Sequence, residues 1–230
     1  MSTPTDGVIF DMDGVLVDTY RAHYESWLEL ARSEGFELSE EDFAKTFGCT
    51  SREILVGLGR RHGREVSSEE VAAMDARKEA AFRRIIAARV PVMPGGLELL
   101  EGLHAAGFRL ALGSSAPPEN VELVMDRLEL RKWMDATVTG RDVTRGKPDP
   151  QVFLLAAERL GVPPARCVVI EDAPVGITAA HAAGMAAVGL ASTGRTRQSL
   201  AAADLVIDRL DELSPDRLRR LIAARGRPAG

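Results

Sequence analysis

The stretch that decides the fold is Val8-Ile-Phe-Asp11-Met-Asp13-Gly14, close to the beginning of the chain. Its apolar run is too short for a helix and ends abruptly at two acids and a glycine. Such a run is typical of a buried strand in a parallel sheet, here with Asp11 and Asp13 at its carboxyl end. An Asp-x-Asp-Gly run is also a common turn, so these acids acquire a function only together with other residues.

Further apolar runs of strand length recur later in the chain, and most are separated by segments with helical spacing. The predicted strands are Arg109–Leu112, Ala136–Val138, Cys167–Ile170, Ala187–Leu190 and Leu205–Ile207. Strands that alternate with helices of about ten to fifteen residues indicate a parallel sheet with helices on both faces. We therefore predict an α/β fold with a Rossmann-like parallel sheet.

The segment between the first two predicted strands has a different character, because it contains no convincing strand. Ser39 and Ser67 each precede a run of acids, which is the pattern of a capped helix start. The sequence predicts an all-helical cap domain of residues 19–90, inserted after the first strand of a core domain made of residues 1–18 and 91–230.

Composition bounds the function. The chain has 230 residues, of which 45% are hydrophobic, so it can bury a large core and is not disordered. Its formal net charge of −5 disfavours a nucleic-acid partner, since such proteins usually carry a basic surplus. Cys49 and Cys167 form no paired motif, and no apolar run approaches the ~20 residues of a membrane span. We expect a cytoplasmic protein without a membrane partner, either a monomer or a weak dimer.

Polar residues follow several of the predicted strands. They are Asp11 and Asp13 after the first strand, Ser114 and Ser115 after the second, Lys147 in a Gly-Lys-Pro-Asp-Pro turn after the third, and Glu171 and Asp172 after the fourth. Because ligands bind beyond the carboxyl ends of strands in an open parallel sheet, we expect these side chains at one rim. Taken singly, Ser114 is equally a helix cap, Lys147 a solvated side chain, and the last two acids a cap of the following helix.

Electrostatics favours a joint function for these residues. Four carboxylates in one cleft repel each other, and a like-charged pair at 4 Å costs on the order of 4 kcal/mol at an effective dielectric constant near 20. Such a cluster persists only if cations or protons neutralise it. Lys147 supplies one positive charge, and a divalent ion would supply two more. An all-oxygen ligand set suits Mg²⁺, so the rim is predicted to bind an anion through a metal, with phosphate foremost.

The order of these motifs resembles that of the haloacid dehalogenase superfamily, and the chain is most similar to its β-phosphoglucomutase-like branch with a small helical cap. The resemblance implies that Asp11 is the nucleophile and Asp13 the general acid and base. Ser114 and Lys147 would hold the phosphoryl oxygens. Mg²⁺ would be bound by Asp11, the backbone carbonyl of Asp13 and Asp172, with Glu171 as a further ligand or as a partner of the ligands.

The same resemblance suggests substrate-binding residues. His23 stands where mutase relatives carry a histidine at the cap hinge, and Arg52 where they carry a phosphate-binding arginine. Asn120 and Ser115 are expected to contact substrate from the core. As plain structural alternatives, His23 is a helix-face residue and Arg52 an exposed residue of a first helical turn. One departure is that Gly48 stands where the mutase cap has a lysine, with Lys45 about one turn away.

Two arginines late in the chain, Arg195 and Arg197, are expected to be solvated. They follow the fifth predicted strand.

The leading functional hypothesis is a Mg²⁺-dependent phosphatase that acts on a small phosphorylated metabolite, such as a sugar or polyol phosphate, through an aspartyl phosphate on Asp11. The acid at position 13 favours an oxygen ester over a halide as the leaving group, because an alcohol needs a proton to leave. A β-phosphoglucomutase-type phosphomutase is the first alternative. A phosphoacceptor signalling domain is the alternative from another class, and an idle phosphate-binding protein is a third.

Overall fold

The computed structural model describes residues 5–46 and 49–225, which form two compact units. The first unit contains the chain up to Asp18 and from Val90 onward, and the second is Thr19–Arg89.

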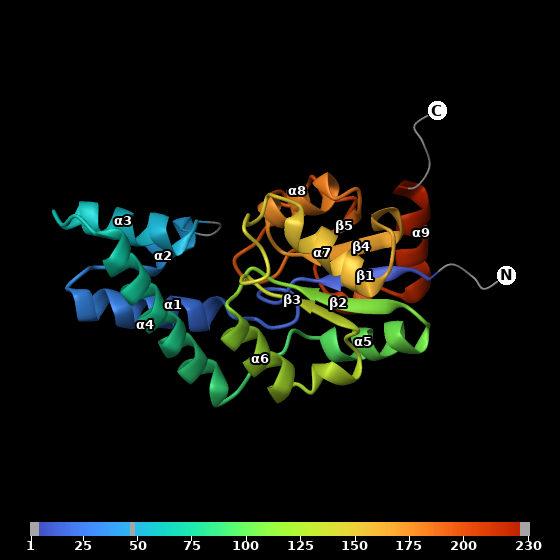
Figure 1. The fold of residues 1–230 in the computed structure, drawn as a ribbon, viewed down its shortest axis with the longest axis horizontal. Helices are drawn as coiled ribbons and strands as arrows, with labels where there is room; N and C mark the ends of the chain where they lie inside the picture. Colours follow the sequence, from blue (N-terminus) through green and yellow to red (C-terminus); the bar gives the residue numbers. More distant parts are fainter. Residues whose placement is uncertain (1–4, 47–48, 226–230) are drawn as a thin grey trace. The chain divides into compact units, whose positions relative to one another are not determined.

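A six-stranded sheet forms the centre of the first unit (Figure 1). Its strands are β1 (Gly7–Phe10), β2 (Arg109–Gly113), β3 (Ala136–Val138), β4 (Cys167–Glu171), β5 (Ala186–Leu190) and β6 (Leu205–Ile207). The strand order is β3-β2-β1-β4-β5-β6, and every neighbouring pair is parallel. The predicted α/β fold is confirmed, as are all the strands expected from the apolar runs.

Helices cover both faces of this sheet (Figure 1). Helices α5 (Gly96–Ala105) and α6 (Pro118–Arg127) lie on one side, and α7 (Gln151–Leu160) and α8 (Pro174–Ala182) lie on the other; α9 (Pro215–Arg225) packs near β4 and β5. Short 3₁₀ turns occur at Leu130–Lys132, Pro164–Arg166 and Leu210–Glu212. Fully buried residues such as Ile9, Phe153 and Ile177 form the core between the sheet and α7 and α8. Their burial supplies the main favourable free energy of this layer.

The insertion between β1 and β2 begins with four helices that make up the second unit. They are α1 (Tyr20–Glu34), α2 (Glu40–Lys45), α3 (Ser51–Arg61) and α4 (Ser68–Ala87). Ser39 accepts a hydrogen bond from the amide of Asp42 at the start of α2, and Ser67 forms a reciprocal capping box with Glu70 at the start of α4. Both predicted helix starts are therefore confirmed.

The strand order places the end of β1 at the reversal point of the sheet, because β1 lies between β2 and β4. Phe10 is in register with Leu112 on one side and with Ile170 on the other. The residues that follow these three strands therefore emerge at the same edge. A reversal of strand order is where open α/β sheets usually bind their ligands.

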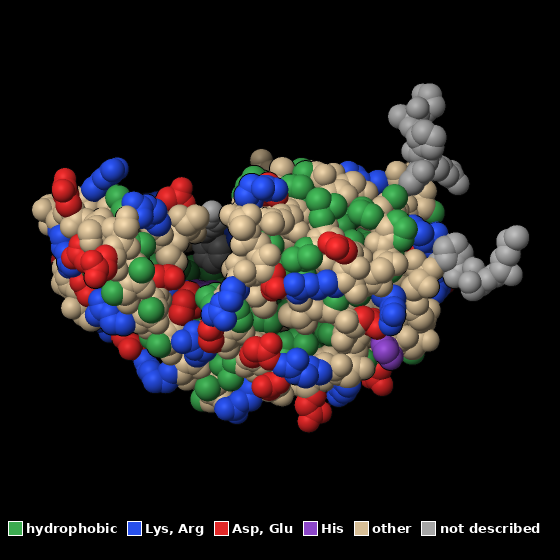
Figure 2. Space-filling model, in the orientation of Figure 1, with side chains coloured by type: hydrophobic (Ala, Val, Ile, Leu, Met, Phe, Trp, Pro, Cys, Tyr) green, Lys and Arg blue, Asp and Glu red, His purple; other side chains and the backbone are tan. Residues whose placement is uncertain are grey.

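Acidic and basic side chains are interspersed over the face of the molecule drawn in Figure 2. In the part of the chain that the structure describes, no helix combines the length and the apolar character needed to cross a bilayer.

Candidate active site

Asp11 directly follows β1, and its amide donates a hydrogen bond to the carbonyl of Ile170 on β4 at 3.0 Å. The chain then turns tightly, and Gly14 adopts a φ of +77°, in the left-handed region that favours glycine. A Cβ at this position would lie 2.4 Å from Oδ2 of Asp172. The glycine of the Asp-x-Asp-Gly run is thus required both for the turn and for the close approach of Asp172.

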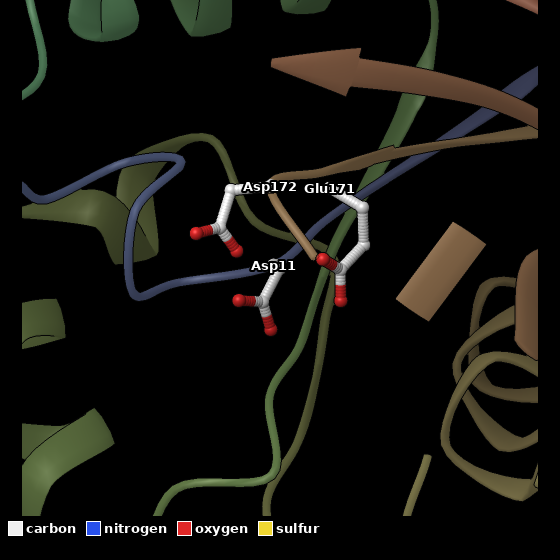
Figure 3. A group of neighbouring side chains, drawn as sticks. All are labelled: Asp11, Glu171 and Asp172. Atoms are coloured by element: carbon white, nitrogen blue, oxygen red, sulfur yellow. The ribbon is translucent and has the colours of Figure 1, made fainter. Parts of the chain in front are cut away.

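Three carboxylates meet where β1 and β4 end (Figure 3). Asp11, Glu171 and Asp172 each offer an oxygen atom, and these atoms lie within 4.8 Å of one another. All three residues are buried; Asp11 and Asp172 are 7% exposed and Glu171 is 1% exposed. Water therefore screens their mutual repulsion poorly.

Lys147 is the cation that partly neutralises this cluster. Its Nζ lies 2.7 Å from Oδ1 of Asp11 and 2.6 Å from Oε1 of Glu171, and its side chain is only 8% exposed. Burial acts to lower the pKa of Lys147, but the charges of Asp11 and Glu171 outweigh it and hold the pKa above its usual value. The lysine is therefore a fixed positive charge inside the site, and the alternative of a solvated side chain is wrong.

Burial also governs the protonation of the aspartates. It raises the pKa of Asp11 well above the usual value; Lys147 opposes this effect, and the charges of Glu171 and Asp172 add to it. Burial, followed by the charge of Glu171, raises the pKa of Asp172 to about 7, although Arg195 opposes the rise. Lys147 and Arg195 together do not offset the charge of three buried carboxylates, so the cluster favours a further cation.

The carboxylate of Glu171 is engaged on both oxygens. Its Oε1 accepts a hydrogen bond from Lys147, and its Oε2 accepts one from the amide of Ala173 at 2.8 Å. Gly176 on α8 makes room for it, since a Cβ there would lie 1.8 Å from Oε1. Glu171 is thus held in place by its neighbours, which suits a residue that orients the lysine and the other acids.

The residues of this cluster fit a divalent metal ion. The donors are carboxylate oxygens, which Mg²⁺ prefers, and they lie close enough together to share one ion. Because Glu171 already has partners on both oxygens, Asp11 and Asp172 are the carboxylates best suited to direct coordination.

The other core residues expected at the site follow the same strand ends. Asp13 is half-buried and its backbone pairs with Val17 in the turn after β1. Ser114 follows β2 and is 2% exposed; its amide donates to the carbonyl of Val138, and its hydroxyl accepts from the amide of Ala116. It does not cap a helix, because α6 begins only at Pro118. Ser115 is exposed.

Asn120 lies in the first turns of α6 and is 1% exposed. Its burial within the core unit is compatible with a structural role as well as with the expected contact to substrate.

The residues expected to read the substrate from the cap belong to the second unit. Nδ1 of His23 on α1 lies 2.9 Å from Nζ of the buried Lys78 on α4, and its ring stacks on Phe82 with 4.2 Å between ring centres. Arg52 lies in the first turn of α3, is exposed and donates a hydrogen bond to the hydroxyl of Ser68 at 3.0 Å.

Two residues were noted for the position where the mutase cap carries a lysine. Gly48 lies outside the described residues, while Lys45 is exposed and pairs with Glu41 at 2.7 Å.

The expectation that Arg195 is solvated is wrong. It lies in the loop after β5, its side chain is 12% exposed, and its Nε is 3.1 Å from Oδ2 of Asp172. Arg197, in contrast, is 55% exposed and pairs with Asp208, as a surface residue would. The sequence signal for Arg195 is its place after β5, because the loop after that strand emerges at the same edge of the sheet.

A family model for haloacid dehalogenase-like hydrolases matches residues 5–184 of this chain. The match includes β1, the insertion, Lys147 and the two acids Glu171 and Asp172 at the end of β4. The chain belongs to the haloacid dehalogenase-like hydrolases. The resemblance carried by the ordered motifs is thereby confirmed.

Curated relatives of this hydrolase include both phosphatases and a mutase. It is 35% identical over 180 residues to a phosphorylated carbohydrates phosphatase from Thermotoga maritima, covering 78% of this chain and 82% of the relative. It is 32% identical over 212 residues to the β-phosphoglucomutase of Bacillus subtilis, covering 90% of this chain and 91% of the relative.

A solved structure supports the same branch of the family. The β-phosphoglucomutase of Clostridium difficile superposes with a TM-score of 0.82 at 26% identity, over 96% of this chain and 98% of the other. The hydrolase is therefore β-phosphoglucomutase-like in fold.

Proposed function

We propose that this hydrolase is a Mg²⁺-dependent phosphatase of a small phosphorylated metabolite, a sugar or polyol phosphate, and that Asp11 forms an aspartyl phosphate. The observation that carries the proposal is the contact of one buried lysine with both Asp11 and Glu171, beside Asp172. This arrangement provides a carboxylate nucleophile, a fixed positive charge for the phosphoryl group and carboxylates for a metal. The name of the Thermotoga relative agrees with the substrate class.

Asp11, Asp172 and the backbone carbonyl of Asp13 would hold the metal. When bound there, Mg²⁺ would supply positive charge that offsets the charge of the carboxylates and attracts the phosphate of the substrate.

Four side chains of the core carry out the steps of the reaction. An oxygen of Asp11 attacks phosphorus, and the bond from phosphorus to the ester oxygen breaks. Asp13 gives a proton to the departing alcohol and then takes one from the water that attacks the aspartyl phosphate. Lys147 and Ser114 hold the phosphoryl oxygens and offset the charge that spreads over them in the transition state.

In this proposal, His23 and Arg52 of the helical unit and Ser115 and Asn120 of the core bind the part of the substrate that does not react. The bounds of the two units, residues 19–90 for the cap and the remainder for the core, are part of the same proposal. Exclusion of water from the reacting atoms is the physical benefit of such a cap. A cytoplasmic location is proposed from the two unpaired cysteines.

A phosphomutase is the second candidate, and the resemblance of His23 to a mutase hinge residue favours it, as does the Bacillus relative. Incubation with a hexose 1-phosphate and a trace of the bisphosphate separates the two functions. The phosphatase proposal predicts free phosphate, whereas conversion to the 6-phosphate without free phosphate would support the mutase.

The substrate class is tested by measuring phosphate release from a panel of sugar, polyol and nucleotide phosphates with Mg²⁺ present. We expect many turnovers on at least one sugar or polyol phosphate and weaker activity on nucleotides. A single stoichiometric phosphorylation without turnover would instead support a phosphoacceptor domain.

A further inference from the structure

The loop between β5 and β6 brings an arginine into the acid cluster. Nε of Arg195 donates to Oδ2 of Asp172 at 3.1 Å, and the two side chains are 12% and 10% exposed. An ion pair this far from water is screened much less than a surface pair. Arg195 is therefore a second fixed cation beside the site, in addition to Lys147.

The position of Arg195 is determined by its own loop. The amide of Arg195 donates to the carbonyl of Ser192 at 2.9 Å in a turn that uses Gly194 at a φ of +79°. Within the same turn, the hydroxyl of Thr193 donates to Oδ2 of Asp18 at 2.7 Å. The turn is thus anchored to the segment after β1 as well as to Asp172.

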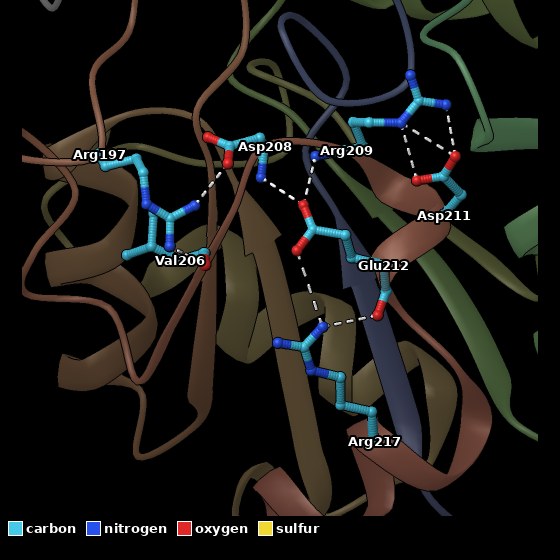
Figure 4. Close-up of polar contacts among 7 residues, drawn as sticks. All are labelled: Arg197, Val206, Asp208, Arg209, Asp211, Glu212 and Arg217. Carbon is cyan, nitrogen blue, oxygen red and sulfur yellow. Dashed lines mark hydrogen bonds and ion pairs between the residues drawn. The ribbon is translucent and has the colours of Figure 1, made fainter.

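A third contact fixes the loop on its other side (Figure 4). Arg197 donates to the carbonyl of Val206 at 2.9 Å and pairs with Asp208 at 2.8 Å, both at the end of β6. Arg197 and Arg195 therefore belong to the same loop but have different partners. Only Arg195 contacts the acid cluster through a contact that the structure records.

Each of the three acids contacts one of the two cations. Lys147 contacts Asp11 and Glu171, and Arg195 contacts Asp172. A guanidinium stays charged at any pH at which the protein is folded, so this positive charge cannot be removed by losing a proton. A divalent ion on Asp172 would share that carboxylate with Arg195 and would be repelled by its charge.

We propose that Arg195 is a positioning residue that competes with Mg²⁺ for Asp172 and thereby weakens Mg²⁺ binding. This inference rests on the metal site of the proposed function. Arg195 then has two effects. Without metal it stabilises the charged form of Asp172, and with metal present it raises the dissociation constant for Mg²⁺. Mg²⁺ would consequently be held loosely enough to exchange.

The test is a calorimetric titration of the full chain with MgCl₂ in a buffer without phosphate. Arg195→Gln removes the charge and is expected to lower the dissociation constant for Mg²⁺ by about tenfold, an estimate from the Coulomb energy of a unit charge near a divalent ion. Arg195→Lys retains the charge and should stay within about twofold of the parent protein. Arg197→Gln is the matched control and should leave the constant unchanged, because the partners of Arg197 are Val206 on β6 and Asp208 just after it.

Thermal unfolding provides a second readout that does not depend on activity. Arg195→Gln should lower the Tm in EDTA, because Asp172 loses its partner, and should show a larger rise in Tm at saturating Mg²⁺ than the parent protein. The same changes in Tm are expected for Arg195→Met, which replaces the glutamine variant in the test if that variant does not fold.

The possible results of the titration distinguish a failure of this inference from a failure of the metal site. An unchanged or larger dissociation constant in Arg195→Gln, with normal binding by the parent protein, would overturn the competition and leave the metal site intact. A parent protein that binds no Mg²⁺ would overturn the metal site and this inference with it. A loosened loop alone would not tighten metal binding, so a lower constant distinguishes competition from a purely structural role.

Discussion

At the scale of single residues, the carboxylates of the site lie so close to two backbone positions that only glycine fits there. Gly14 and Gly176 are the clearest cases, because a side chain at either position would overlap a carboxylate of the cluster. Lys147 shows how one cation is used twice, since it contacts Asp11 and Glu171 from a position that water hardly reaches. These two glycines thus shape the site by leaving room for its carboxylates.

Gly14→Ala should therefore damage the site more than an ordinary glycine substitution. The alanine would occupy a left-handed φ, which costs roughly 1–2 kcal/mol, and would also displace Asp172. Gly107→Ala is the matched control, because Gly107 has a φ of +81° and nothing within 4 Å of its added Cβ. Urea unfolding should show a similar strain cost in both variants, whereas phosphatase assays should show a marked loss only in Gly14→Ala. Equal activities in the two variants would contradict the steric account.

At the scale of elements, the parallel sheet could be predicted from short apolar runs because its strands are buried on both faces. The starts of α2 and α4 could be predicted as well, since Ser39 and Ser67 precede acids in the capping pattern. The place of Arg195 after β5 puts it at the right edge of the sheet, but its contact with Asp172, 23 residues away in the sequence, could not be predicted, because it depends on the path of a loop. Strand ends can be located from the sequence, whereas loop paths depend on tertiary contacts.

The loop from β3 to α7, which carries Lys147, is held by Asp142. Its carboxylate accepts hydrogen bonds from the amide and the hydroxyl of Thr139, each at 2.8 Å, and pairs with Arg159 at 2.6 Å. The hydrogen bond from Arg159 and then that from the amide of Thr139 lower the pKa of Asp142 to about 2.

Asp142→Asn should reduce the free energy of unfolding at neutral pH by about 1.5–3 kcal/mol, the usual range for hydrogen bonds to a charged group. Because the pKa is lower in the folded than in the unfolded chain, this stabilisation is complete above about pH 4 and declines as the pH falls toward 2. Urea unfolding from pH 7 to pH 3 should show the difference between the two proteins narrowing at the acid end. The exposed Asp216→Asn is the control and should change stability by less than about 0.5 kcal/mol.

At the scale of the whole molecule, the chain devotes one unit to the chemistry and inserts a second, helical unit between the first two strands of the sheet. Part of the negative charge behind the net charge of −5 is concentrated locally, because three of the acids are buried together at one edge of the sheet. The sequence could predict that Asp11, Glu171 and Asp172 meet there, since parallel strands end at a common edge; Asp13, which was expected beside them, is not one of the three. It could not predict how deeply they are buried or which bases accompany each of them.

Binding of Mg²⁺ should stabilise the folded protein by neutralising this cluster. At a hundredfold excess over the dissociation constant, one site adds about 2.7 kcal/mol, which corresponds to a rise in Tm of roughly 5–10 °C for a chain of this size. Scanning calorimetry in MgCl₂ and in EDTA checks the shift. Asp172→Asn should abolish most of the rise, whereas the exposed Asp126→Asn should keep it. A melting curve that does not respond to Mg²⁺ would count against the metal site.

The central claim is that Asp11 carries the phosphoryl group, and acid quenching of the working enzyme tests it most directly. The enzyme is mixed with its best phosphate ester and Mg²⁺, quenched in acid within the first turnover, digested and analysed by mass spectrometry. We predict one added phosphoryl group on the peptide that contains Asp11, absent from Asp11→Asn, together with a loss of turnover in that variant of about a thousandfold or more. Normal turnover by Asp11→Asn, or a phosphoryl group on another residue, would contradict the account.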